Sequence, residues 1–434
     1  MIMNSSIKTG IRGRRRTKHL GYALFISLLM VMTAYVAVLP VFGSHLQNYL
    51  GIGDATFGLI FSLGALAGIG LALIGGPLVD RLGAVRMIRY GLRGVAAGMI
   101  LLALPGAHWQ VIMAGCTVCS IASGSLVIAV YRYLVQLFPR DRRRVLALTL
   151  AICSGGGILL PLIAEGLLLL SRNVQGLSFA TVLHGPFAVI AVVVLAASTS
   201  FRGGKRRAIG ESKNTKPLVN WHSLILPLPI AWLVFMLGLH GAADTTLMVW
   251  MPRFLGSATL TDHPLVPGVV ISAYSLSYLV ARSLLALLPE DWGRRRLLVL
   301  PGLLGGGVLI AGILFHNFWL AAGGYVLGAF LWSSEYPAIQ GVIAERDRRH
   351  FGAALALVGV PGGILGFALI HGTGLLAAAV GERNLDLAIL LPALCFPLVG
   401  LAGALWVGLF YRARLIKSSP GPAGRMSVLR GDRL

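Results

Sequence analysis

The chain has 434 residues, of which 56% are hydrophobic and only 12% are charged, and its formal net charge is +22. A soluble domain is about one quarter charged, so this composition excludes an ordinary soluble protein and indicates one that crosses a membrane many times. The basic balance alone would fit nucleic-acid binding, but the apolar runs leave no folded soluble domain to perform it. We therefore expect no nucleic-acid partner.

Apolar runs make up most of the chain. A helix needs roughly 20 residues to cross about 30 Å of hydrocarbon, and the runs have about that length. We place twelve of them, at about residues 20–42, 56–79, 87–106, 109–134, 145–170, 178–200, 222–251, 265–288, 297–315, 318–343, 352–380 and 386–411. The sequence thus predicts an all-α membrane protein with twelve transmembrane helices.

The basic residues are unevenly distributed between the loops. They precede the first run and follow every even-numbered run, whereas the opposite loops hold only Arg172, Arg253 and Arg383. Positive charge gathers on the cytoplasmic side and against anionic headgroups, so both termini are expected in the cytoplasm. The first run is too long for the hydrophobic region of a cleavable signal peptide. We expect a monomeric, multi-pass protein of the cell (inner) membrane.

The segment between the second and third runs reads GPLVDRLGAVR, from Gly76 to Arg86. Its spacing, G-x-x-x-D-R-x-G-x-x-R, resembles the signature loop of major facilitator superfamily transporters, with Ala84 where a basic residue is more usual. The resemblance extends over nearly the whole chain. It implies two six-helix pseudo-repeats and secondary active transport of a small solute by alternating access.

This resemblance assigns a gating role to the loop. Asp80 would bond helix N-termini or arginines of the other half in one state and release them in the other, which sets the balance of the two states. The alternative is an ordinary connecting loop. Arg132, near the inner end of the fourth run, either faces Asp80 or extends to the interface. The gating set is Gly76, Asp80, Arg81, Gly83, Arg86 and Arg132.

A polar interval at residues 201–221 separates two halves of six runs. We interpret it as a cytoplasmic linker between an N-terminal half, 1–200, and a C-terminal half, 222–434. The stretch 63–86 has an echo at 273–296, where an apolar run again ends in an acid, a glycine and arginines. Repeats of this kind place a transport site near the bilayer midplane between the halves.

The seventh run resembles a narrower group within the superfamily. The run from Gly241 to Leu255, with Asp244, Trp250 and Pro252, is similar to the G-x-E-x5-W-x-P-x-[YF]-L pattern of the fucose–proton symporter group, with Asp in place of Glu. Two shorter segments are also similar to that group, Ala281-Arg282 and Tyr336-Pro337-Ala338. Sugar–proton symporters of that group carry a carboxylate in the first span, and residues 21–42 contain none. The coupling residue must lie elsewhere, or the solute is not a fucose-like sugar.

Charged residues inside the spans are the main candidates for function, because each costs at least about 2.5–3.5 kcal/mol near the bilayer centre. Glu335 lies near the middle of the tenth run, with Trp332 and Tyr336 beside it. A low dielectric favours the neutral form of a carboxyl, so Glu335 is the predicted proton-coupling residue, with the two aromatic side chains shaping a solute site. The alternative is a permanent structural ion pair with Arg282.

Further candidates lie in neighbouring spans. Arg282 follows Tyr274 and Tyr278 on nearly the same stripe of the eighth run. Asp244 and His240 are four residues apart in the seventh run, in its outer third, so an outer gate or cap is as plausible as a solute contact. Glu165 lies near the outer interface, and a structural role is favoured for it.

The sequence lacks the motifs that would indicate an enzyme, an ATP-driven transporter or a metalloprotein. It has no glycine-rich phosphate loop followed by Lys-Ser/Thr and no metal-binding spacing, and its four cysteines lie in apolar runs. We therefore expect no enzyme activity, no metal and no cofactor. A non-transporting receptor is one rival. Among transporters, a proton-coupled carrier of a polar solute, such as a sugar or organic acid, is favoured, and a proton-driven exporter of amphiphilic compounds is the alternative.

Overall fold

The computed structural model describes residues 21, 24–29, 34–138, 142–201, 225–257, 267–287, 294–346, 354 and 356–411. The predicted all-α, twelve-helix membrane fold is confirmed, and every described element is a helix. Most of the predicted linker, 202–221, lies outside the described residues, so the division of the chain at 201–221 stays a prediction.

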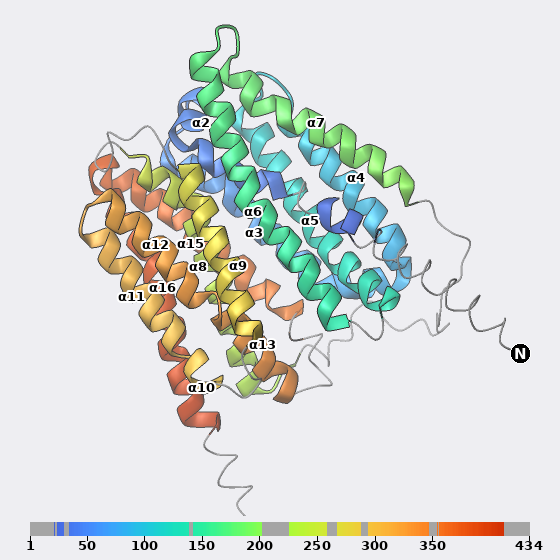
Figure 1. Ribbon diagram of the computed structural model, residues 1–434, viewed down its shortest axis with the longest axis vertical. Helices are drawn as coiled ribbons and strands as arrows, with labels where there is room; N and C mark the ends of the chain where they lie inside the picture. The colour runs from blue at the N-terminus through green and yellow to red at the C-terminus, as the bar shows by residue number, and fades with distance from the viewer. Residues whose placement is uncertain are drawn as a thin grey trace, which may run out of the picture.

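The N-terminal helices form one bundle, on the blue-to-green side of Figure 1. A short helical stretch at 24–29 precedes it. The elements are η1 (Ala34–Phe42), α2 (Gly43–Leu50), α3 (Asp54–Leu82), α4 (Ala84–Leu102), α5 (Trp109–Leu137), α6 (Arg142–Asn173) and α7 (Phe179–Ser200).

The C-terminal helices form the second bundle, coloured yellow to red in Figure 1. Its elements are α8 (Leu228–Leu255), α9 (Pro267–Leu287), α10 (Arg294–Leu297), α11 (Leu300–Leu314), α12 (Phe318–Trp332), α13 (Glu335–Arg346), α15 (Gly359–Val380), η3 (Glu382–Asn384), α16 (Leu385–Trp406) and η4 (Val407–Tyr411). Two predicted spans are interrupted, the ninth between α10 and α11 and the tenth between α12 and α13.

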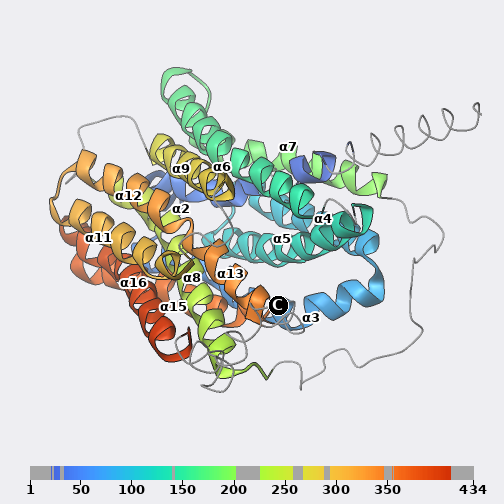
Figure 2. The same ribbon diagram turned by 60° about the horizontal axis from the view of Figure 1, so that its bottom comes forward.

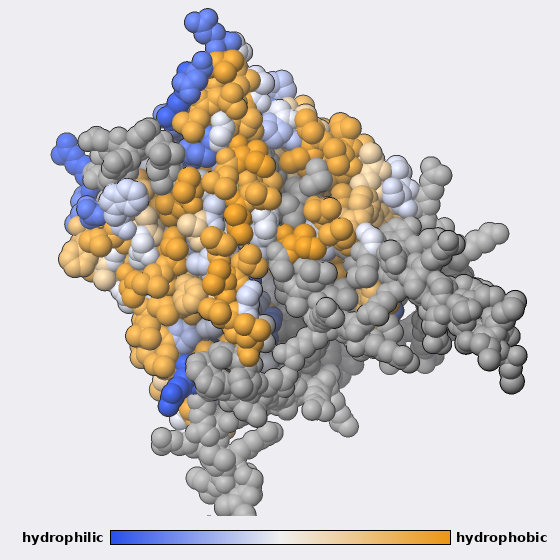
Figure 3. Space-filling view, in the orientation of Figure 1, coloured by the Kyte–Doolittle hydropathy of each residue, from blue (hydrophilic) through white to orange (hydrophobic). Residues whose placement is uncertain are grey.

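The outer surface of the bundle suits a lipid environment. Eight of the described helices are long and apolar enough to cross a membrane by themselves. Large apolar side chains face outward, among them Val189 and Val192 on α7 and Leu304 on α11. Figure 3 shows apolar residues covering the middle of one face, with hydrophilic residues towards its ends. Because exposed apolar surface of this extent is rare in soluble proteins, the surface indicates burial in a bilayer.

The turn between α3 and α4 consists of one residue, Gly83, with φ +82°. Only glycine adopts this backbone conformation without strain, which explains its place there. The expected loop from Gly76 to Arg86 is therefore mostly helical, with Gly76 and Asp80 inside α3 and Arg86 in the first turn of α4. This is a correction, because helical backbone bonds continue through the glycine and charged residues as far as Leu82.

The two bundles meet along α3 with α15 and along α6 with α9, which lie side by side in Figure 2. We call the end that holds α2 and the α6–α7 turn the outer end, and the end that holds Gly83 and α10 the inner end, after the orientation that the basic residues predict. Glycines allow close approach here: a Cβ added at Gly374 would lie 2.7 Å from the Asp54 carbonyl oxygen, and one at Gly157 would lie 2.7 Å from Ser275 Oγ.

Candidate functional site

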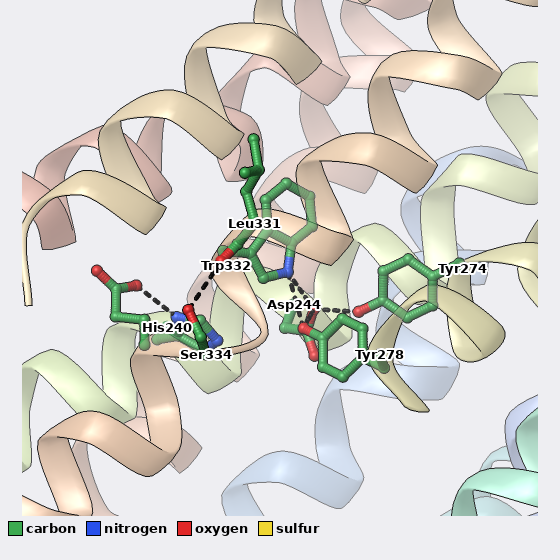
Figure 4. Close-up of polar contacts among 8 residues, drawn as sticks. His240, Asp244, Tyr274, Tyr278, Leu331, Trp332 and Ser334 are labelled. Carbon is green, nitrogen blue, oxygen red and sulfur yellow. Dashed lines mark hydrogen bonds and ion pairs between the residues drawn. The ribbon is translucent and has the colours of Figure 1, made fainter. Parts of the chain in front are cut away.

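Asp244 on α8 is the centre of a cluster of hydrogen bonds inside the C-terminal bundle (Figure 4). Its Oδ1 accepts a hydrogen bond of 2.7 Å from the Tyr278 hydroxyl and another from the Tyr274 hydroxyl, both on α9. The indole Nε1 of Trp332, at the end of α12, donates to the same oxygen at 3.3 Å and to the Tyr278 hydroxyl at 2.7 Å. Donors from two other helices, α9 and α12, thus hold one carboxylate oxygen of α8 in place.

Aromatic rings surround this carboxylate. Tyr274 stacks on Tyr325 with ring centroids 4.5 Å apart, and Trp332 stacks on Phe396 of α16 at 3.9 Å. Tyr325, Trp332 and Phe396 are fully buried. Because stacked rings have few rotamers, the donors that reach Asp244 are fixed before any ligand arrives. Sequence reasoning missed Tyr325 and Phe396, which carry no charge and stand in no motif.

His240 and Glu335 form a second, adjoining pair. His240 Nδ1 lies 2.8 Å from Glu335 Oε2, and both side chains are buried. Glu335 Oε1 packs against Gly302 of α11, where an added Cβ would come within 2.8 Å. Imidazole and carboxyl groups can each carry the proton of such a hydrogen bond.

The structure does not show the alternative considered for Glu335, an ion pair with Arg282, because Glu335 pairs with His240. The tenth run, expected to be one span, is broken between Trp332 and Glu335, since α12 ends at Trp332 and α13 begins at Glu335. Pro337 explains the break: it has no N–H to donate to the carbonyl four residues earlier. At the break, the Ser334 hydroxyl donates to the Leu331 carbonyl at 3.1 Å (Figure 4).

The expected depth of His240 and Asp244 in the outer third needs correction too. The helix that carries them runs from Leu228 to Leu255, several residues further outward than the predicted 222–251. At 1.5 Å per residue, Asp244 lies about 24 Å from one end and about 17 Å from the other. The two residues therefore lie on either side of the middle of α8. The predicted contact between them is replaced by contacts with other helices.

Arg282 lies one turn beyond Tyr278 on α9, half-buried. Its guanidinium carbon is 4.6 Å from the centroid of the Tyr278 ring. Tyr336 of α13 and Tyr131 of α5, in the other bundle, are close enough to sense its charge. Arg282 makes no hydrogen bond or ion pair with a described residue, and its Nε is buried.

Charged residues at the outer end join the two bundles. Arg253 Nη2, at the end of α8, bonds Glu382 Oε1 at 2.5 Å, and its Nε lies 3.5 Å from Asp54 Oδ1 on α3. Gln47 Nε2 donates to the same Asp54 oxygen at 2.7 Å. Sequence reasoning counted Arg253 only as a loop charge. The sparse acids of the outer loops were the signal that could have revealed this cluster.

Glu165 also lies at the contact between the bundles. It is buried on α6, and its Oε2 accepts a hydrogen bond of 3.1 Å from the backbone N–H of Gly268 at the start of α9. The first N–H groups of a helix have no partner within the helix, so a carboxylate there is stabilising. The contact is a cap across the bundle interface.

The gating set lies at the inner end. Arg81 is in the last turn of α3, and Arg81, Arg86 and Arg132 are exposed. The side chain of Asp80 lies outside the described residues, so its expected contact with Arg132 stays a prediction. Within the part of the chain that the structure describes, no group of three His, Cys, Asp or Glu side chains could hold a metal ion.

Residues 24–262 match the family model described as Major Facilitator Superfamily. The chain belongs to this superfamily. Its members are transporters rather than enzymes, so the coarse functional expectation from sequence agrees with the family.

Curated relatives match shorter stretches. The multidrug resistance protein MdtH of Edwardsiella ictaluri (strain 93-146) is 29% identical over 165 residues, which cover 36% of this chain and 39% of the relative. The protein of the same name from Yersinia enterocolitica serotype O:8 / biotype 1B is 30% identical over 153 residues, covering 34% and 37%. The matched region thus covers less than two fifths of the length of each of these relatives.

Solved structures resemble the chain over nearly its whole length. A bacterial homolog of the human lysosomal transporter Spinster, in an inward-facing and occupied conformation, has a TM-score of 0.65 and 13% identity, covering 92% of this chain and 98% of that one. The E. coli fucose:proton symporter FucP has a TM-score of 0.61 and 17% identity, covering 89% and 98%. At these identities the likeness shows the fold alone.

Proposed function

We propose that this chain is a proton-coupled secondary transporter of a small polar solute, such as a sugar or an organic acid. The observation that carries the proposal is the buried pair His240 and Glu335 beside the Asp244 cluster. Buried ionisable groups inside a membrane protein are costly and are typical of proton relays and solute sites. Membership of the superfamily supports alternating access as the mechanism.

In this proposal one cluster binds the solute and the other carries the proton. Asp244 and its tyrosines provide a rigid polar surface for the hydroxyl or amino groups of a solute. The pair His240 and Glu335 takes up a proton on one side of the membrane and releases it on the other. Trp332 links the two, because it donates to Asp244 and lies three residues before Glu335. A solute that displaces Trp332 would therefore disturb both clusters together.

Alternating access requires contacts that form and break between the bundles. At the outer end, the Arg253 cluster and the Gly374 crossing hold the bundles together in this structure. The glycine turn at Gly83 and its flanking arginines are the proposed inner gate. We further propose both termini in the cytoplasm, the inner membrane as location and a monomer as the working form. The likeness to the fucose–proton symporter group also stays a proposal.

Solute-dependent proton movement tests the proposal. The purified protein would be reconstituted into vesicles that contain a pH-sensitive dye, with pooled sugars, amino acids and organic acids added outside. We expect at least one pool to move protons across the membrane with it, and empty vesicles to show no response. Solute uptake that is indifferent to the pH gradient would contradict proton coupling.

Export of amphiphilic compounds is the second candidate. The MdtH relatives favour it, because they are named multidrug resistance proteins. Under this alternative the aromatic rings around Asp244 would bind an apolar cation. Cells that express the chain would then accumulate less ethidium than cells with an empty vector, and vesicles would respond to ethidium rather than to polar solutes. The same vesicle assay decides between the two candidates.

A further inference from the structure

Arg282 is a cation for which the described structure supplies no counter-ion. The two acids of the site have other partners, Asp244 the Tyr274, Tyr278 and Trp332 side chains and Glu335 the His240 ring. A cation–π contact is worth about 0.5–2 kcal/mol. Placing an arginine within the hydrocarbon costs at least about 2.5–3.5 kcal/mol. The Tyr278 ring therefore offsets only part of the cost of this charge.

The side chain of Arg282 does not escape to the headgroups. Helix α9 runs from the outer end to the inner end. Tyr278 therefore lies one turn closer to the outer end than Arg282 does. The guanidinium is stacked over that ring, 4.6 Å from its centroid, so it points towards the middle of the bundle. A snorkelling arginine would extend the other way.

Two tyrosines, one from each bundle, lie within electrostatic range of Arg282. They are Tyr131 of α5 and Tyr336 of α13, and both are half-buried. A guanidinium has five N–H donors in a planar fork, which match the oxygens of a carboxylate or phosphate. An anionic group of this kind would provide the missing charge.

We infer that the transported solute carries an oxyanion, carboxylate or phosphate, and that Arg282 binds it. The inference rests on the proposed transport function and narrows its solute class. The oxyanion lies on Arg282 between Tyr131 and Tyr336, and the polar remainder of the solute reaches towards Asp244. A solute with a negative group at one end and hydroxyl or ammonium groups at the other fits both ends of the site.

Thermal stabilisation of the purified protein tests this inference without requiring transport. The probes are succinate with succinamide, gluconate with glucose, and glycerol 3-phosphate with glycerol, at matched ionic strength. We expect at least one anion to raise the apparent Tm while its neutral counterpart does not. The carboxylate and phosphate arms separate the two sources of the oxyanion.

Three variants assign the effect to the residue. Arg282→Gln should weaken binding of that anion at least about tenfold, Arg282→Lys should weaken it less, and Arg296→Gln, at an exposed arginine on α10, should leave it unchanged. Equal stabilisation by neutral counterparts, an anion effect that survives in Arg282→Gln, or no anion-specific effect at all would overturn the inference. Proton-coupled transport of a neutral solute would overturn it as well, while leaving the proposed function intact.

Discussion

Arg253 and Asp54 lie 3.5 Å apart, Nε to Oδ1, and connect the last turn of α8 in one bundle to the first turn of α3 in the other. Both side chains are largely shielded from solvent, and Glu382 bonds the same guanidinium at 2.5 Å. In the proposed alternating-access cycle, charges in this position would hold the outer end closed. They must separate whenever that end opens, so their strength biases the balance between the two states.

Removing this contact should favour opening of the outer end. In Arg253→Gln, Asp54 keeps its bond from Gln47, so the fold should survive. A hydrogen bond to a charged group contributes about 1.5–3 kcal/mol, which corresponds to a shift of roughly tenfold or more towards the outward-open state. Spin labels at the exposed residues Asn48 and Asn384 would report longer distances. An unchanged distance distribution, equal to that of the control Arg383→Gln, would show that the cluster does not hold the gate.

The α3–α15 crossing gives a second test of outer closure. A Cβ at Gly374 would lie 2.7 Å from the Asp54 carbonyl oxygen and 3.0 Å from the Trp250 ring, whereas one at Gly372 would meet only Leu391 at 3.8 Å. Gly374→Ala should therefore lower the transport rate about tenfold or more by preventing closure, and Gly372→Ala should not. Comparable rates in the two variants would contradict a closing role for this crossing.

Replacing Asp244 should weaken solute binding more than replacing the adjacent Thr245 does. Asp244→Ala leaves the hydroxyls of Tyr274 and Tyr278 without their acceptor, whereas the Trp332 N–H keeps the Tyr278 hydroxyl, and each orphaned buried donor costs about 1–3 kcal/mol. We expect a lower apparent Tm and at least about tenfold weaker solute binding. Thr245→Ala is the control, since that hydroxyl bonds only Gly241 of its own helix. Solute affinity equal to wild type in Asp244→Ala would remove Asp244 from the site.

The fold was predictable from sequence because apolar length determines how many spans form, and the orientation that the basic loops indicate stays a prediction. For the candidate site, the sequence identified the charged residues but not their partners. Glu335, Asp244 and Arg282 stand out as charges in apolar runs, but the partner of each depends on helix rotation and depth. A shift of α8 by a few residues moved His240 and Asp244 to mid-span, and the break before Glu335 turned that side chain towards His240.

Uncharged contributors left no sequence signal. Phe396 and Tyr325 look like ordinary apolar residues, and Gly302 is one glycine among 56. Their role follows from tertiary packing alone, where Phe396 stacks on Trp332 and Gly302 makes room for Glu335. The outer cluster was hidden for a related reason, since Asp54, Arg253 and Glu382 are about 130 to 330 residues apart in sequence.

His45, at the outer end beyond the first span, should make stability depend on pH. Burial, followed by the Arg172 charge, lowers the pKa of His45, and Arg172 Nη2 lies 2.9 Å from its Nε2. The folded state therefore favours the neutral ring. The contribution of neutral His45 to stability is fully present above the ordinary histidine pKa of 6.5. It is lost as the pH falls from 6.5 towards the lowered pKa of the folded state. The apparent Tm should fall with acidification less steeply in Arg172→Gln. Identical pH profiles would contradict the assignment.

The central claim is that Glu335 carries the coupled proton, and Glu335→Gln tests it most directly because it keeps the shape and mimics the protonated carboxyl. In vesicles, with a solute identified by the proton-flux assay, we measure both accumulation driven by a pH gradient and exchange without one. The account predicts that the variant loses accumulation but retains exchange, since exchange moves no net proton. Accumulation against a gradient at the wild-type level in Glu335→Gln would contradict the account.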